Sequence, residues 1–192
     1  EKAKYLEIIF LNHDVFSKIK NDLGLAKHYE HNIALRTQEP CYTKQFKIPE
    51  VHRPMLEAQV QEWLKMGIVQ RSNSKFNSPV FIVPKKEPGT FRFVQDFRQL
   101  NQNSLEDKYC MKDVSECIGD IGRAGSTIFS TLDLTSGFWQ MPLGKTSRHY
   151  TAFTIPGMGQ FEWLVSDMGL KSCPGGFQRL VEMAMQGLNS VI

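Results

Sequence analysis

The stretch PVFIVPKKEPGTFRFVQDF, residues 79–97, contains two short runs of β-branched and aromatic residues joined by Lys-Lys-Glu-Pro-Gly-Thr. Proline and glycine between two such runs favour a tight turn, so the stretch predicts a β-hairpin. The hairpin is also basic, because residues 71–98 hold six Lys and Arg side chains against two acidic ones. This local charge of +4 exceeds the formal net charge of the whole chain, which is +3. A basic hairpin is a candidate surface for an anionic partner.

The segments around this hairpin combine helices with a second hairpin. Apolar residues at steps of three and four predict an amphipathic helix over residues 54–66, closed by Gly67. Pro174 opens another helix, whose apolar side runs to Leu188. HYTAFTI and QFEWLV, joined by Pro-Gly-Met-Gly, predict the second hairpin. Because helices and hairpins are mixed without regular βαβ alternation, the predicted fold class is α+β.

Three further segments complete the secondary-structure prediction. YLEIIFLNHDVFSKI, near the N-terminus, is helix-like. Residues 98–125 are predicted to form a loop followed by a short helix around residues 114–118. FSTLDL, residues 129–134, alternates two faces and predicts a strand that Asp133 ends.

Composition excludes several classes of protein. The chain has 192 residues, of which 41% are apolar and 22% charged, values typical of a folded globular chain. The four cysteines form no C-x-x-C pair, so we expect free thiols in a reducing compartment, the cytoplasm or a virus-like particle inside the cell. His28 and His31 are close enough for a metal site, but solvated or core side chains are the commoner outcome. No signal peptide or membrane-spanning run is found, and we expect a piece of a longer protein with no membrane partner.

Residues 129–147, FSTLDLTSGFWQMPLGKTS, contain two candidate sites for chemistry. The final Gly-Lys-Thr-Ser is similar to the end of a phosphate-binding loop, but Trp139 occupies the position where that loop needs its first glycine. We therefore expect an ordinary turn there. Asp133, followed by Ser136 and Gly137, could hold a metal ion beside free backbone N–H groups. The alternative is that Asp133 only caps the next turn.

Four blocks of the sequence decide between these alternatives. They are SPVFIVPKKEPGTFRFVQDFRQLNQ, STLDLTSGFWQMPL, TAFTIPGMGQFEWL and MGLKSCPGGFQRLVEMAM. In order and approximate spacing, the blocks resemble the reverse transcriptase of gypsy-type LTR retrotransposons and retroviruses, over about residues 45–192. The resemblance implies a right-hand polymerase fold, of which this chain would hold the fingers and part of the palm, with the thumb absent.

The resemblance also implies a division of the chain. Residues 1–44 would be an N-terminal connecting segment, 45–105 the first part of the fingers and 106–140 the first part of the palm. Residues 141–172 would return to the fingers, and 173–192 would form a palm helix.

The implied reaction is attack of a primer 3′-hydroxyl on the α-phosphate of a dNTP, assisted by two Mg²⁺ ions, or Mn²⁺. Asp133 matches the first catalytic carboxylate, which binds metal together with the backbone carbonyl of Leu134. Ser136 and Gly137 match the turn whose amides meet the triphosphate. Phe138 matches the aromatic residue that excludes a ribose 2′-hydroxyl, and the alternative for this residue is simple core packing.

The fingers positions follow from the same blocks. Lys85 and Arg92 match residues that grip the phosphates, with the turn 87–90 giving the hairpin its flexibility. Their alternative is a solvated basic hairpin. Met168 matches a nucleotide contact. The implied contacts to the template strand are Phe81, Val94, Arg98 and Gly169.

The sequence departs from the family pattern at two points. Asp167 stands where a proline is expected, and Ser172-Cys173 replaces a pair of small residues such as Asn-Ala. An acidic group beside the nucleotide would repel the triphosphate, so Asp167→Pro is expected to preserve or raise incorporation.

The two remaining catalytic carboxylates of the family occur as a Tyr-x-Asp-Asp hairpin, and the 192 residues contain no Asp-Asp dipeptide. We expect this chain alone to bind Mg²⁺ weakly and not to polymerise. The implied partners are a primed RNA or DNA template, dNTPs and the other Pol domains: the rest of the palm, thumb, ribonuclease H, integrase and protease. The alternative function is a non-enzymatic, domesticated or degenerate remnant that keeps the fold and binds nucleic acid.

Overall fold

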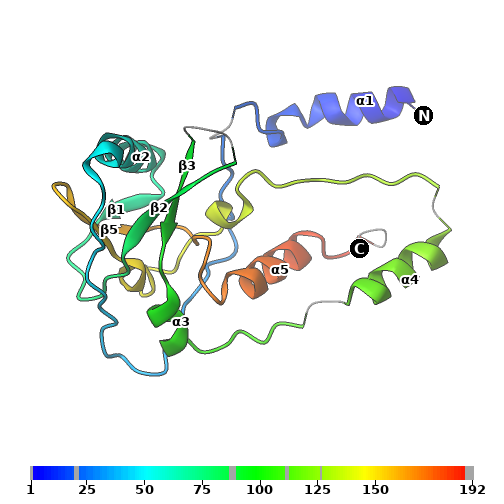
Figure 1. Cartoon of the computed structure of the whole chain (residues 1–192). Coiled ribbons are helices and arrows are strands. Elements are labelled where there is room, and N and C mark those ends of the chain that lie inside the picture. The colour runs from blue at the N-terminus through cyan, green and yellow to red at the C-terminus, as the bar shows by residue number, and fades with distance from the viewer. Residues whose placement is uncertain (1, 20–21, 87–89, 111–112, 126, 189–192) are drawn as a thin grey trace.

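The fold is that of a computed structural model, which describes residues 2–19, 22–86, 90–110, 113–125 and 127–188 (Figure 1). The helices are α1 (Lys2–Leu11), α2 (Arg53–Met66), α3 (Arg98–Asn103), α4 (Val114–Ala124) and α5 (Cys173–Ala184). The strands are β1 (Val69–Arg71), β2 (Val80–Pro84), β3 (Phe91–Gln95), β4 (Phe153–Ile155) and β5 (Gly159–Trp163). Short 3₁₀ helices are η1 (His13–Val15), η2 (Glu50–His52), η3 (Gly137–Gln140) and η4 (Arg148–Thr151). This mixture of helices and antiparallel sheets confirms the α+β prediction.

Two antiparallel sheets contain the predicted hairpins. β2 pairs with β3, and β4 pairs with β5 across the Pro-Gly-Met-Gly turn, so both hairpins are confirmed. β1, which the sequence did not indicate, adds to the free edge of β5 and gives the order β1-β5-β4. β1 follows α2 directly, because Gly67 takes a left-handed conformation with φ of 69° and reverses the chain.

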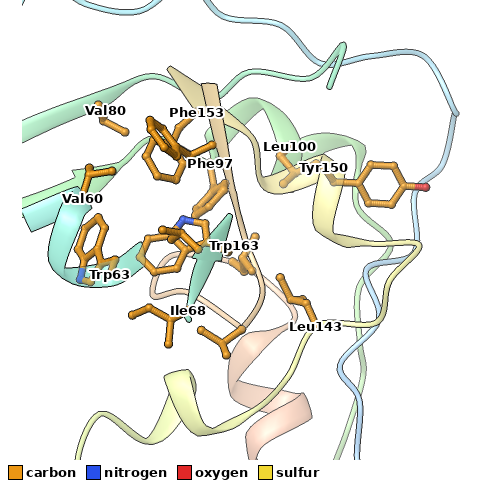
Figure 2. Close-up of a cluster of buried hydrophobic side chains, with 14 of the residues drawn as sticks. Val60, Trp63, Ile68, Val80, Phe97, Leu100, Leu143, Tyr150, Phe153 and Trp163 are labelled. Carbon is orange, nitrogen blue, oxygen red and sulfur yellow. The ribbon is translucent and has the colours of Figure 1, made fainter. Parts of the chain in front are cut away.

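The core lies between α2 and these sheets and is rich in aromatic side chains (Figure 2). The predicted apolar stripe of α2 is confirmed, since Leu56, Val60 and Trp63 are all buried. The Trp63 ring lies 4.9 Å from the Trp163 ring and meets Phe93 edge-on at 4.6 Å. One helix therefore contacts both sheets through a single indole.

Residues 29–48, here called the N-terminal strap, pack along the same core. The His31 backbone N–H donates to Pro142 at 2.8 Å, and the His31 carbonyl accepts from Gly144 at 2.9 Å. Farther along the strap, Tyr42 bridges to Asn77, and Ile33 and Ile48 are buried. The strap thus belongs to the folded unit, whereas α1 before it leaves its apolar side chains from Tyr5 to Leu11 exposed.

Several secondary-structure predictions were wrong. FSTLDL forms no strand: residues 128–134 are extended and exposed, and no described segment pairs with them, so they have no ladder hydrogen bonds. The predicted loop after β3 begins with α3, which buried Leu100 stabilises. α4 is longer than predicted and ends at Gly125, which has φ of 60°. The apolar side of α5 stops before Leu188, which lies beyond the helix.

Figure 1 shows where these corrected segments lie. α4 stands apart from both sheets, and the extended segment that leaves it runs back to η3 beside α5. Among the described residues, no helix has the length and apolar character needed to cross a membrane.

Candidate active site

The turn that follows Asp133 has an unusual backbone conformation. Ser136 has φ of 47° and is the one non-glycine residue with positive φ in the described part of the chain. Left-handed conformations of this kind cost of order 1–3 kcal/mol and cluster at functional sites. The turn leads into η3, where Trp139 donates its backbone N–H to the Ser136 carbonyl at 2.8 Å. The local strain and the predicted triphosphate cradle therefore coincide.

Phe177 of α5 holds this turn from one side. The Phe138 ring meets the Phe177 ring edge-on, with centroids 5.3 Å apart. A Cβ atom at Gly137 would lie 2.8 Å from Cζ of Phe177, so residue 137 must be glycine for η3 to approach α5 this closely. Phe138 is half-buried, so the core packing that was its alternative role is present, and its contact with the sugar stays a prediction.

Gly137→Ala is expected to destabilise the fold by about 1–3 kcal/mol, because the added methyl group forces η3 and Phe177 apart. Urea denaturation followed by circular dichroism measures the change. Gly122→Ala in α4 is the matched control, since a Cβ there meets nothing within 4 Å. The control should be neutral or stabilising, by up to about 1 kcal/mol. Equal effects of the two substitutions would contradict the packing argument.

Asp133 and Leu134 lie in the extended segment just before the turn. Asp133 is exposed, and the Leu134 side chain is 50% exposed. In the part of the chain that the structure describes, no group of three or more His, Cys, Asp or Glu side chains could hold a metal ion. One carboxylate and one backbone carbonyl leave most positions around an octahedral Mg²⁺ to water and cannot hold two such ions tightly. The described residues alone therefore do not fit a pair of Mg²⁺ ions.

The β2–β3 hairpin places several predicted site residues on one face. Its register pairs Phe81 with Val94 and Val83 with Arg92. Because side chains alternate along a strand, these four side chains share the face opposite to Ile82 and Phe93, which face the core. Lys85 continues the alternation from Val83, and its backbone N–H donates to the Thr90 carbonyl at 2.8 Å. Residues 87–89 of the predicted flexible turn lie outside the described residues.

Arg98, the remaining basic site residue, is already paired. Its guanidinium donates to both carboxylate oxygens of Asp96, with Nη2–Oδ2 and Nε–Oδ1 distances of 2.7 and 2.9 Å. This hydrogen bond lowers the pKa of the Asp96 carboxyl. The Arg98 side chain is still 85% exposed, so it remains at the surface while Asp96 fixes its direction.

The turn that carries Met168 and Gly169, residues 166–172, lies against α3. Gly169 has φ of 102°, and its carbonyl accepts a hydrogen bond from the Asn101 side chain at 2.8 Å. The Asn101 side chain also accepts from the backbone N–H of Lys171 at 2.8 Å. Met168 is 66% exposed. Asn101 thus fixes this turn, a role that no sequence signal indicated because its segment was predicted to be a loop.

The buried side of the same turn is polar. His31 of the strap contacts the Ser166 hydroxyl at 2.7 Å through Nδ1 and the Ser172 hydroxyl at 2.9 Å through Nε2. Burial lowers the pKa of His31 to about 4, so the ring is neutral. His28 is exposed. The pair is therefore one core histidine and one surface histidine, as the commoner alternative predicted.

Asp167 belongs to this turn and is buried, with its carboxyl hydrogen-bonded to η3. Its Oδ1 accepts a hydrogen bond from the indole N–H of Trp139 at 3.2 Å. Burial raises the pKa of Asp167 to about 7, while the hydrogen bonds from Trp139 and from the backbone N–H of Met168 act in the opposite direction. The side chain is only 7% exposed, so it lies inside the fold and does not project into solvent.

The Gly-Lys-Thr-Ser segment is an ordinary turn, as predicted. The Ser147 hydroxyl accepts a hydrogen bond from the Ile33 backbone N–H at 2.9 Å, and Gly144 lies against the Asn32 side chain. The turn therefore serves to hold the strap. All four cysteines are free thiols, and Cys173 is the buried one.

Comparison with known proteins shows the family to which the chain belongs. Residues 83–192 match the family model described as reverse transcriptase (RNA-dependent DNA polymerase). The chain belongs to this family.

The similar proteins include transposon polyproteins. The Pol polyprotein of the Drosophila melanogaster transposon 412 is 34% identical over 180 residues, which cover 91% of this chain and 14% of that protein. The Pol polyprotein of the transposon gypsy from the same organism is 30% identical over 186 residues, covering 94% of this chain and 18% of that protein. This chain therefore spans less than a fifth of each of these two relatives.

A foamy viral protease-reverse transcriptase, solved in complex with an RNA/DNA hybrid, has a similar structure. Its TM-score is 0.81 at 25% sequence identity, and the match covers all of this chain and 25% of that one. The predictions of family and of fold are both confirmed.

Proposed function

We propose that this chain is the fingers and first palm part of an RNA-directed DNA polymerase within a retrotransposon Pol polyprotein. The observation that carries the proposal is the strained turn at Ser136, directly after Asp133 and fixed by Phe177 of α5. A bare backbone turn beside a free carboxylate is suited to a triphosphate and its metal ions. Within the proposal, the segment boundaries of the fingers and palm are those predicted from the sequence.

Each site residue has a proposed task in nucleotidyl transfer. Ser136 and Gly137 offer backbone N–H groups to the triphosphate, and Phe138 closes the space beside the sugar. Lys85 and Arg92, on one face of the hairpin, bind the phosphates, while Phe81, Val94 and Arg98 lie along the template strand. Met168 contacts the nucleotide and Gly169 the template, both from the turn that Asn101 fixes.

Mg²⁺ is proposed as the cofactor of the longer protein. Asp133 and the Leu134 carbonyl would supply one part of its site. Two further carboxylates would have to join them, because the described residues are too few to hold two ions. The two-metal reaction is accordingly proposed for the protein that carries this chain together with a second carboxylate pair, and the 192-residue chain alone is proposed to be inactive.

Primer extension on an RNA template, by a polymerase that contains this chain, tests the proposal. Arg92→Ala is expected to raise the KM for dNTP about tenfold, since it removes a charge-assisted contact to phosphate. Lys65→Ala is the control, because Lys65 is exposed near the end of α2 and far in sequence from the site residues. An unchanged KM in Arg92→Ala would contradict the phosphate role.

The second candidate function is binding of nucleic acid without catalysis, which the basic hairpin favours. A binding module would retain duplexes in a salt-dependent manner without metal or dNTP. A polymerase requires Mg²⁺ and a dNTP that matches the template. Duplex binding together with no dNTP incorporation, by a protein that has all three carboxylates, would favour this second function.

A further inference from the structure

The hydrogen bond between Asp167 and Trp139 joins two turns that both carry proposed nucleotide contacts. Trp139 follows Phe138 in η3, and Asp167 directly precedes Met168. The donor and acceptor atoms of this hydrogen bond, Trp139 Nε1 and Asp167 Oδ1, are 3.2 Å apart. Asp167 is only 7% exposed, so water competes little for the carboxyl. A displacement of either turn would change this contact directly.

Trp139 is held so that its N–H has a fixed direction. Its indole stacks on Trp163 with centroids 5.9 Å apart and an interplanar angle of 30°. It also meets Trp63 edge-on at 5.9 Å. The Trp63 indole N–H, by contrast, is buried with no hydrogen-bond partner in the described part of the chain. Of these two tryptophans in one cluster, Trp139 donates its N–H in a hydrogen bond and Trp63 does not. Replacing each by phenylalanine therefore gives a matched pair of variants.

Asp167 also differs from the ion-paired acids of the chain. Asp96, Asp107 and Asp120 each pair with an arginine. Among the described residues, no basic side chain forms a salt bridge with Asp167. An unpaired buried carboxyl is costly to the fold, so its hydrogen bonds are its main compensation.

We propose that Asp167 is a positioning residue for the incoming nucleotide: by accepting the Trp139 N–H, it fixes the turn that carries residues 136–138 relative to the turn that carries Met168 and Gly169. This inference rests on the proposed function, because it assigns Asp167 to the same nucleotide site. It also reverses an expectation from the sequence. Asp167→Pro removes the acceptor and is now expected to impair incorporation.

Asp167 is the group of this cluster that changes charge near pH 7, because the side chains that face it stay neutral there. From α5, Cys173 has its pKa raised to about 12, chiefly by burial, so the thiol is neutral. From the strap, His31 reaches Ser166 and is neutral near pH 7. From η3, the indole of Trp139 does not ionise. Asp107 and Arg179 act on His31 and are not among the groups that shift Asp167.

Because these neighbours stay neutral, the ionisation of Asp167 determines how this cluster makes stability depend on pH. The pKa of Asp167 in the folded protein, about 7, lies above the ordinary aspartate pKa of 3.8. Its contribution to stability is therefore complete below pH 3.8 and is lost as the pH rises through 7. Asp167→Asn, which is isosteric and always neutral, should melt at a higher temperature than the parent at pH 8. The difference should disappear as the pH falls toward 4.

The effect on nucleotide binding has the opposite direction. An ionised carboxylate accepts a stronger hydrogen bond than a neutral carboxyl or amide. The ratio of the KM for dNTP in Asp167→Asn to that in the parent is therefore expected to be close to 1 at pH 6 and about 3 at pH 8. A residue that served only the fold would change the melting temperature without this change in the KM ratio.

The experiment measures KM and kcat for dNTP in a polymerase that contains this chain, with melting temperatures of the same proteins. Trp139→Phe is expected to raise KM about fivefold with kcat little changed, because the donor is lost and the ring is kept. Trp63→Phe removes an N–H that has no partner and should leave KM unchanged. Equal KM values in the two phenylalanine variants, or a KM ratio for Asp167→Asn that is the same at pH 6 and pH 8, would overturn the proposal.

Asp133→Asn, measured in parallel, separates failure of this inference from failure of the proposed function. If Asp133→Asn abolishes synthesis while Trp139→Phe resembles the parent, only the role of Asp167 is refuted. If Asp133→Asn leaves synthesis unchanged, the proposed function is refuted and the inference falls with it. Preserved or increased incorporation in Asp167→Pro would restore the expectation from the sequence and refute the positioning role.

Discussion

Asp133→Asn is expected to lower DNA synthesis at least about 100-fold in a polymerase that contains this chain, equivalent to about 3 kcal/mol of transition-state stabilisation. The reason is that Mg²⁺ binds carboxylate oxygens, whereas an amide is neutral and offers a single oxygen. Asp133 is exposed and outside regular secondary structure, so the substitution should leave the fold unchanged. Primer extension at saturating dNTP and Mg²⁺ measures the loss, and circular dichroism checks the fold.

Asp120→Asn is the matched control for this substitution. Asp120 is half-buried and pairs with Arg123, which is 73% exposed, and ion pairs at a protein surface contribute about 0–1 kcal/mol. Synthesis by the control should equal that of the parent. The same assay on the 192-residue chain alone is expected to give no product. Incorporation by this chain that Asp133→Asn abolishes would contradict the need for a second carboxylate pair.

Trp163→Ala is expected to lower the free energy of unfolding by about 3–5 kcal/mol, the largest effect on stability that we predict. Trp163 has 0% exposure, and its ring contacts Trp63, Trp139 and Phe153. Its indole N–H donates to Gln95 at 2.8 Å, which ties β5 to β3 of the other sheet. The substitution therefore leaves both a cavity and a buried amide with one partner fewer. Urea denaturation followed by far-UV circular dichroism measures the change.

Two companion variants test which part of Trp163 matters. Phe10→Ala removes an aromatic ring that is 77% exposed and should change stability by less than about 0.5 kcal/mol. Trp163→Phe keeps most of the ring but loses the N–H, so its cost should lie between the two. If Trp163→Ala were no more destabilising than Phe10→Ala, the core would not depend on the contact between the sheets.

Prediction from the sequence succeeded where the signal was local. Turn residues and apolar spacing within about 20 residues predicted the hairpins and α2. The four ordered blocks indicated the family. FSTLDL shows the limit of this reasoning, because alternation describes a strand only if a partner is present to complete its ladder. α3 was missed for a related reason: a six-residue helix has little intrinsic stability, and it depends on buried Leu100 and on Asn101 contacting a turn 68 residues away.

The candidate site was also predicted only in part: the sequence indicated its residues but not the surroundings of Asp167. The blocks predicted Asp133, Leu134, residues 136–138 and one face of the hairpin as site residues, and the structure places both groups at the surface or half-buried. The surroundings of Asp167 were not predictable, because the side chain that donates a hydrogen bond to it, Trp139, is 28 residues away. From the sequence the side chain was interpreted as a repulsive charge, and in the structure it is an internal hydrogen-bond acceptor.

The N-terminal strap has a consequence for how the protein is made. The two side-chain contacts of His31 are with Ser166 and Ser172, 135 and 141 residues later in the chain. At about 5–20 residues per second, a ribosome needs on the order of 10 seconds to synthesise the intervening stretch. During that time His31 lacks both hydroxyl partners, although the farther part of the strap can already pair with Asn77. The contacts of His31 are therefore completed late in translation, after the rest of the strap has met its partners.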